Sequence, residues 1–185
     1  YMQSIKSIFL LLFLSVCILS GNSQDIPQRP NPPKLVNDYT NTLTEDQKSA
    51  LEKKLVTFDD STSTQIAVVI IPSLNDYDIS DFALKLGREW GVGGKDYNNG
   101  VVFLISTGDR KINISTGYGV EGALPDITAK HIIDDVVKPN FKGNDYYRGI
   151  DEGTNAIIKA VKGEYQTPRK KDNSTAGGKI LMLVI

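Results

Sequence analysis

The chain has 185 residues, with 22 acidic and 21 basic side chains, 40% hydrophobic residues, one cysteine and one histidine. This balanced composition excludes a disordered polyampholyte, a disulfide-stapled mini-protein, a collagen-like repeat and a strongly basic nucleic-acid binder. The charge is uneven along the chain, because residues 1–23 carry only Lys6 and the tail after residue 165 carries four bases against Asp172. The segment 24–165 keeps 16 bases and 21 acids, a net charge of −5, so the sequence predicts an acidic domain.

Residues 1–23 have the parts of a secretory signal peptide. Lys6 provides the positive flank, an almost unbroken apolar run covers 8–19, and small residues suited to cleavage follow it. The run is shorter than the roughly 20 apolar residues that a membrane-spanning helix needs. Because Cys17 lies inside this run, cleavage would leave a mature chain without a thiol. We therefore expect an exported protein, periplasmic or membrane-tethered outside the cytoplasm, with no disulfide, thiolate metal site or cysteine nucleophile.

Two segments flank the expected domain. Residues 24–34 contain four prolines and predict an extended linker. Residues 166–185 form a polar, basic tail that finishes in the apolar letters KILMLVI. Those last letters fit either the start of a membrane anchor or a short hydrophobic tail. The segment 35–165 between them has the length of one domain.

Helical and strand patterns alternate through 35–165. Capping residues and 3.6-residue periodicity predict helices that begin after Thr44 and at Asp78, Asp126 and Asp145, with the third one stopped by Pro139. Apolar runs predict buried strands at 65–71 and 101–105, and alternation at 111–116 predicts a hairpin partner for the second of these. The fold class is therefore α/β, a three-layer α/β/α sandwich around a small mixed sheet of about four strands.

The single histidine removes most catalytic options. His131 lies in the third expected helix, away from any nucleophile-elbow pattern, which argues against a Ser-His-Asp hydrolase. Its spacing to Asp134 and Asp135 fits either a metal-binding face or, as the better explanation, a solvated helix face. The zincin, P-loop and Rossmann motifs are absent from the sequence.

Two glycine-rich polar loops contain the best candidates for a functional site. The first, 90–100, supplies Asp96, Asn98 and Asn99, and the second, 116–126, supplies Glu121 and Asp126. Carboxylate and amide oxygens without thiolate or histidine favour a hard cation, Ca²⁺ before Mg²⁺. The alternative has equal weight: the glycines make turns, and Asp126 is only a helix cap.

An ordered series of segments resembles the TPM domain family, which is named for a thylakoid-lumen phosphatase-like protein, a photosystem II repair protein and a nematode acetylcholine-receptor modulator. The series comprises LVNDYTNTLTEDQ, QIAVVIIPSL, EWGVG, NNGVVFLIS, INISTGYGVEGALPD and PNFKGNDYYRGI. The likeness extends from Leu35 to about Gly163. It implies an α/β/α sandwich that is exported or membrane-tethered and, in some members, calcium binding where loops cross; one plant member is assigned acid phosphatase activity.

Position by position, the resemblance implies roles for the residues of both loops and for one residue before them. Asp38 matches the acidic residue of the opening motif, Asn99 the Asn-Gly before the strand, Glu121 the acid after Tyr-Gly, and Asp126 the acid that caps a helix. Asn98 stands where aspartate is common, which removes one formal charge. Nearby Asp96 could compensate for it, and either residue could be the ligand.

Our leading hypothesis from the sequence is a non-catalytic, exported TPM domain that binds one or two divalent cations, calcium above all, through the metal-site residues just named. One alternative is a metal-assisted acid phosphatase acting on phosphomonoesters, although the acidic domain would repel such substrates unless metal reverses the local field. The other is a membrane-tethered assembly or modulator module of an envelope complex. In each case we expect a monomer, with an envelope or membrane protein as the possible partner.

Overall fold

The structure is a computed structural model that describes residues 26–94 and 98–165. The expected signal peptide at 1–23 and the basic tail at 166–185 lie outside the described residues, as does Asp96. Within the described part of the chain, no helix is long and apolar enough to cross a membrane.

A four-stranded sheet in the order β1-β2-β3-β4 forms the centre of the domain. Its strands are β1 (Val36–Asp38), β2 (Gln65–Ile71), β3 (Gly100–Ser106) and β4 (Lys111–Thr116). The first three run parallel, and β4 returns antiparallel to β3. The sheet is therefore mixed, and the expected α/β fold class is confirmed.

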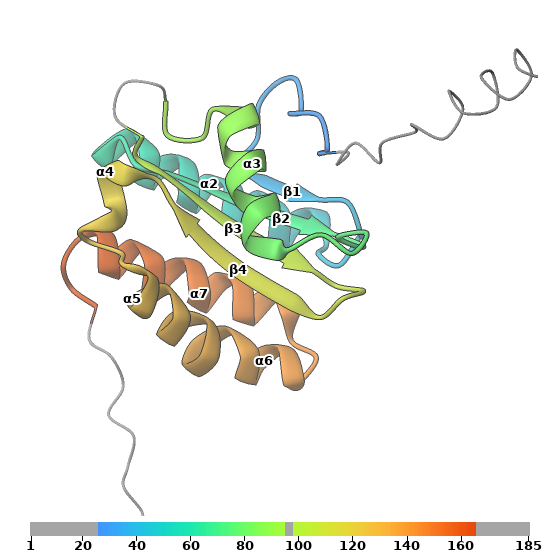
Figure 1. Cartoon of the computed structure of the whole chain (residues 1–185). Coiled ribbons are helices and arrows are strands. Elements are labelled where there is room, and N and C mark those ends of the chain that lie inside the picture. Colours follow the sequence, from blue (N-terminus) through green and yellow to red (C-terminus); the bar gives the residue numbers. More distant parts are fainter. Residues whose placement is uncertain (1–25, 95–97, 166–185) are drawn as a thin grey trace, which may run out of the picture.

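Helices cover both faces of the sheet (Figure 1). One face packs against α3 (Ile79–Trp90), whose Phe82, Leu86 and Trp90 meet side chains of β2 and β3. The other face packs against α2 (Glu45–Thr62), α5 (Asp126–His131), the π-helix η1 (Ile132–Val137) and α7 (Tyr146–Val161). Two short helices, α4 (Tyr118–Glu121) and α6 (Lys138–Lys142), complete the set. Burial on both faces explains the nearly continuous apolar runs of β2 and β3.

Local sequence signals set the ends of the long helices. Thr44 and Gln47 form a reciprocal capping box at the start of α2. The carboxylate of Asp78 accepts hydrogen bonds from the backbone N–H groups of Ser80 and Asp81 at the start of α3. Asp145 accepts one from the N–H of Arg148 at the start of α7. These side chains occupy donors that the first helical turn leaves free, so the predictions for these helix starts are confirmed.

The third expected helix is wrong in two details. Pro139 does not stop it, because α5 continues through η1 into α6 and Pro139 lies in the first turn of α6. Pro139 lies just after the π-helix, where the Lys138 N–H donates to the carbonyl of Ile133 and the hydrogen-bond pattern of the helix changes. Asp126 is not the cap either: Pro125 holds that position, and no side-chain cap hydrogen bond is made.

Part of the expected proline-rich linker packs on the domain. Ile26 is buried against the α3 side of the sheet. The indole N–H of Trp90 donates to the carbonyl oxygen of Pro27 at 2.8 Å. Residues 26 and 27 therefore cover the end of α3 and contribute to the core on that side.

Candidate functional site

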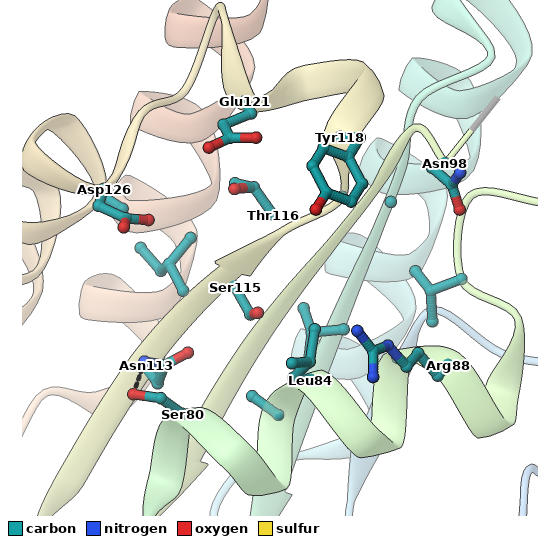
Figure 2. Close-up of a pocket in the computed structure, with 18 of the residues that line it drawn as sticks. Ser80, Leu84, Arg88, Asn98, Asn113, Ser115, Thr116, Tyr118, Glu121 and Asp126 are labelled. Carbon is teal, nitrogen blue, oxygen red and sulfur yellow. Dashed lines mark hydrogen bonds between the residues drawn. The ribbon is translucent and has the colours of Figure 1, made fainter.

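A cleft of about 930 Å³ follows β4 in the described part of the chain. Helix α3 forms one wall of the cleft, and α5 with η1 forms the other. Figure 2 shows Leu84 and Arg88 projecting from α3, with Glu121 and Asp126 on the opposite side. Asn98 and Tyr118 lie at the end of the cleft near the last residue of β4. We call the part of the cleft that Glu121 and Asp126 line, together with Asn98, the acidic end of the cleft.

The two glycine-rich loops meet at this end. Gly117 N–H donates to the carbonyl of Gly100 at 2.8 Å, and Gly119 N–H donates to the carbonyl of Asn98 at 3.3 Å. A Cβ atom on Gly117 would lie only 2.1 Å from the carbonyl oxygen of Asn98, so only glycine allows this approach. Residues from distant parts of the chain are therefore fixed side by side.

Both acids of the second loop are available for a ligand. Glu121 is the last residue of α4 and Asp126 the first residue of α5, and both side chains are exposed. Neither carboxylate makes an ion pair or a hydrogen bond within the described residues. Because Asp126 does not cap α5, its carboxylate is not committed to the backbone. The interpretation of Asp126 as only a cap is thus wrong.

Asp38 does not belong to this group. It pairs with Ile70 near the carboxyl end of β2, whereas Gly100, which follows the first loop, pairs with Gln65 at the amino end. Five residues of strand separate Ile70 from Gln65, a distance of about 17 Å. The Asp38 carboxylate instead accepts from Thr40 N–H at 2.9 Å, Thr40 Oγ1 at 2.7 Å and Leu43 N–H at 2.8 Å. Its work is to hold the turn that follows β1.

Of the three remaining expected ligands, one lines the cleft in the described part of the chain. Asn98 lines the cleft, and its backbone adopts a left-handed conformation with φ of 50°. Asn99 is absent from the described lining, and its carbonyl accepts from the N–H of Gln65 at 2.9 Å. Asp96 lies outside the described residues. Of the six metal-site residues, the structure brings Asn98, Glu121 and Asp126 to one cleft.

Sequence reasoning overlooked three residues of the cleft. Arg88 extends from α3 with no ion pair or hydrogen bond to its side chain among residues 26–94 and 98–165. Tyr118 is 86% exposed beside Glu121, and Leu84 is 42% exposed one helical turn before Arg88. In the sequence, Leu84 could have indicated this wall of the cleft, because it is an apolar residue on the otherwise polar face of an amphipathic helix.

A cluster on the η1 wall supports the solvated-face interpretation of the third helix. Asp134 accepts from Lys138 Nζ at 2.6 Å and from Lys130 Nζ at 3.0 Å. These hydrogen bonds, that from Lys138 first, lower the pKa of Asp134 from 3.8 to about 2. The Asp134 carboxylate is therefore paired with lysines. The described residues contain no group of three or more His, Cys, Asp or Glu side chains that could hold a metal ion.

The acidic end can still provide part of a hard-cation shell. Two uncommitted carboxylates and one amide oxygen are the ligand types that calcium takes, and calcium sites routinely add backbone carbonyls and water. The donor set fits such an ion in type, while two carboxylates are fewer than a high-affinity site uses. What the geometry offers chemically is weak oxygen-ligand binding in an open cleft, across from the Arg88 guanidinium, which has no partner among the described residues.

The structure thus defines a class: a small three-layer α/β/α domain whose cleft follows the edge strand β4. The sequence profile of the TPM domain matches residues 36–160, and the chain belongs to the TPM domain family.

Several solved structures are similar to this chain, among them the following three. One is the solution structure of the N-terminal domain of a protein from P. gingivalis, with 34% identity and a TM-score of 0.66 over 74% of this chain and 88% of that one. The BA42 protein from the psychrophilic bacterium Bizionia argentinensis has 18% identity and a TM-score of 0.59, covering 73% and 90%. The N-terminal domain of the cg2496 protein from Corynebacterium glutamicum has 13% identity and a TM-score of 0.54, covering 82% and 89%. The last two support the fold alone. No curated protein matches the chain.

Proposed function

We propose that this TPM domain binds a divalent cation, calcium before magnesium, at the acidic end of the cleft. The observation that carries the proposal is the position of Glu121 and Asp126: two uncommitted carboxylates that line one cavity together with the amide of Asn98. The role of the cation is to hold the two glycine-rich loops together, so the domain acts as a binding or modulatory module outside the cytoplasm. An exported location follows from the signal-peptide pattern of residues 1–23.

Electrostatics support a stabilising role for the cation. Glu121 and Asp126 place two negative charges in one cleft, and a bound divalent ion neutralises them. Binding to the folded state alone adds about 2.7 kcal/mol of stability when free ion reaches a hundred times its dissociation constant. The expected consequence is a melting temperature that rises with calcium and falls with chelator.

One observation favours a second candidate function. Arg88 faces the same cleft as Glu121 and Asp126 without a partner among the described residues, and a guanidinium is well suited to a phosphate group. Cations held by the two carboxylates would offset the net charge of −5 that residues 24–165 carry, and they would polarise the phosphoryl group. This describes a metal-assisted phosphatase acting on phosphomonoesters, and hydrolysis of a generic phosphomonoester that requires Arg88, Glu121 and Asp126 would support it.

Isothermal titration with calcium tests the leading proposal. We expect binding to the wild-type domain and at least tenfold weaker binding to the double variant Glu121→Gln, Asp126→Asn, because both charges that attract the ion are lost. Asp46→Asn is the control, since Asp46 is an exposed acid in the first turn of α2, at the opposite end of the sheet. Equal affinity of the double variant and the control would place the cation elsewhere, and no binding at millimolar calcium would refute the proposal.

A further inference from the structure

One edge of the sheet carries unused hydrogen-bonding groups. The sheet order leaves β4 at the edge, paired with β3 on one side only. Gly117 N–H donates to the carbonyl of Gly100, which makes this a hydrogen-bonded pair of the antiparallel ladder. Such pairs alternate with non-bonded ones, so the odd-numbered residues of β4 bond to β3. The N–H and C=O groups of Ile112, Ile114 and Thr116 therefore point away from β3.

These free groups open into the cleft. Ile112, Ile114 and Thr116 all line it, between the α3 wall and the wall of α5 and η1. Outside the β3–β4 ladder, their backbone groups make no hydrogen bond within the described residues. A strand added on the free side of β4 would lie about 4.8 Å from it. The cleft of about 930 Å³ is open along this side. The cleft is therefore placed to receive a further strand.

The two walls differ in chemistry. Ile114 belongs to the core cluster on the face covered by α5 and η1, where Ile112 and Ile133 are only partly buried. Successive strand residues face opposite sides, so Asn113 and Ser115 face α3, and Asn113 Nδ2–H donates to Ser80 Oγ at 3.0 Å. A strand added beside β4 would place alternate side chains against an apolar wall and against α3.

The α3 wall favours an acidic side chain. Arg88 is exposed there without an ion pair or a hydrogen bond to its side chain in the described part of the chain, and Leu84 provides apolar surface beside it. Lys111 adds an exposed cation at the first residue of β4. Positive charge is therefore confined to the α3 side of the free edge, while Glu121 and Asp126 lie on the opposite side of the cleft.

We propose that the free edge of β4 binds an extended segment of a partner protein, in which apolar and acidic side chains alternate. The segment pairs its backbone with Ile112, Ile114 and Thr116 and becomes the fifth strand of the sheet, the binding mode known as β-augmentation. Its apolar side chains pack against Ile112 and Ile133, and an acidic one pairs with Arg88. The proposal goes beyond cation binding, because none of these contacts requires a cation.

NMR titration with a short capped peptide of alternating valine and glutamate tests the proposal. We expect amide shifts along β4 and slower hydrogen exchange at the N–H groups of Ile112, Ile114 and Thr116, because these become hydrogen-bonded. N-methylation of one alternating set of peptide residues should abolish binding, and N-methylation of the other set should not. Backbone pairing produces this difference, whereas a side-chain-only contact does not.

Charge reversal provides the second arm. Arg88→Glu is expected to weaken binding of the glutamate peptide by about fivefold or more and to strengthen binding of a valine–lysine peptide. Lys53→Glu, an exposed lysine on α2, is the matched control and should leave both affinities unchanged. Arg88 is exposed, so its variant is expected to fold.

Three results would overturn the proposal: equal affinity for the glutamate and lysine peptides, unchanged exchange at the three edge amides, or a dimer that pairs β4 with β4 of a second copy in sedimentation. Running each titration with calcium and with chelator separates this proposal from cation binding. Peptide binding that persists in chelator supports the strand proposal whether or not the cation proposal holds.

Discussion

Lys54 connects two helices through an unusually dense set of contacts. Its ammonium donates to Asp151 Oδ1 at 2.6 Å, Thr154 Oγ1 at 2.7 Å, Asn155 Oδ1 at 3.0 Å and the Asp151 carbonyl at 3.1 Å. Burial lowers the pKa of Lys54, and the hydrogen bond to Asp151 opposes that shift. The contacts thus offset the cost of partly burying a charge between α2 and α7.

Replacing this lysine should destabilise the domain. Lys54→Met keeps most of the apolar stem but removes every hydrogen bond, and we expect a loss of about 1–3 kcal/mol in the free energy of unfolding. Urea denaturation measures the loss. Lys53→Met, at the exposed neighbouring position, should change stability by less than about 0.5 kcal/mol. Equal effects of the two variants would show that the contacts of Lys54 contribute no net stability.

Asp134 should make stability depend on pH in a narrow acidic range. Its pKa is about 2 in the folded state against an ordinary 3.8, so its contribution is present above 3.8 and is lost as pH falls towards 2. Because the ion pairs are on the surface, we expect Asp134→Asn to cost less than about 1 kcal/mol near neutral pH, and less still at high salt. The difference in stability between the two proteins should shrink as pH falls below 3.8 and disappear only below 2. A difference that does not shrink over this range cannot come from this carboxylate.

At the scale of elements, the sequence predicted the long helices and the central strands because each carries its own local signal. Thr44, Asp78 and Asp145 mark helix starts, and the short β-branched apolar runs of β2 and β3 indicate buried strands. Strand β1 was not foreseen, because three residues are too few for a periodic pattern. The π-helix was not foreseen either, because packing of η1 against α7 has no signature in a single sequence.

Only the parts of the candidate site that have a local signal in the sequence were predicted. Both glycine-rich loops are visible in the sequence, and the structure brings Asn98, Glu121 and Asp126 to one cleft. The position of Asp38 depends on the direction of β1, which only the sheet topology settles. The contribution of Arg88 depends on which helix forms the wall of the cleft, and that is a tertiary property.

Gly117 tests whether contact between the two loops matters for the site. A methyl group there would meet the carbonyl of Asn98 at 2.1 Å, so Gly117→Ala must push the first loop away from α4. We expect calcium affinity to fall by about tenfold or more, because the first loop then no longer holds Asn98 beside the second loop. Gly122→Ala is the control, since its Cβ would meet nothing within 4 Å. If both variants bind calcium as the wild type does, the close approach of the loops is irrelevant to the cation.

For the whole molecule, the acidic residues at the two ends of the parallel strands have different roles. At the carboxyl ends of the parallel strands, where open α/β sheets usually bind ligands, Asp38 and Asp109 hold turns by hydrogen bonds to backbone N–H groups. At the amino ends, Glu121 and Asp126 have no such bonds to the described residues. We therefore place the cation at the amino ends of the parallel strands, where the carboxylates of Glu121 and Asp126 make no hydrogen bond to the described residues, and not at the carboxyl ends, where Asp38 and Asp109 bind backbone N–H groups.

Residue-resolved NMR titration with calcium tests this placement most directly. The account predicts saturable amide shifts centred on Asn98, 117–121 and Asp126, with little change at Asp38 or Asp109. The double variant Glu121→Gln, Asp126→Asn should lose those shifts. Shifts centred instead on the turns at Asp38 and Asp109, or no saturable shift at millimolar calcium, would contradict it.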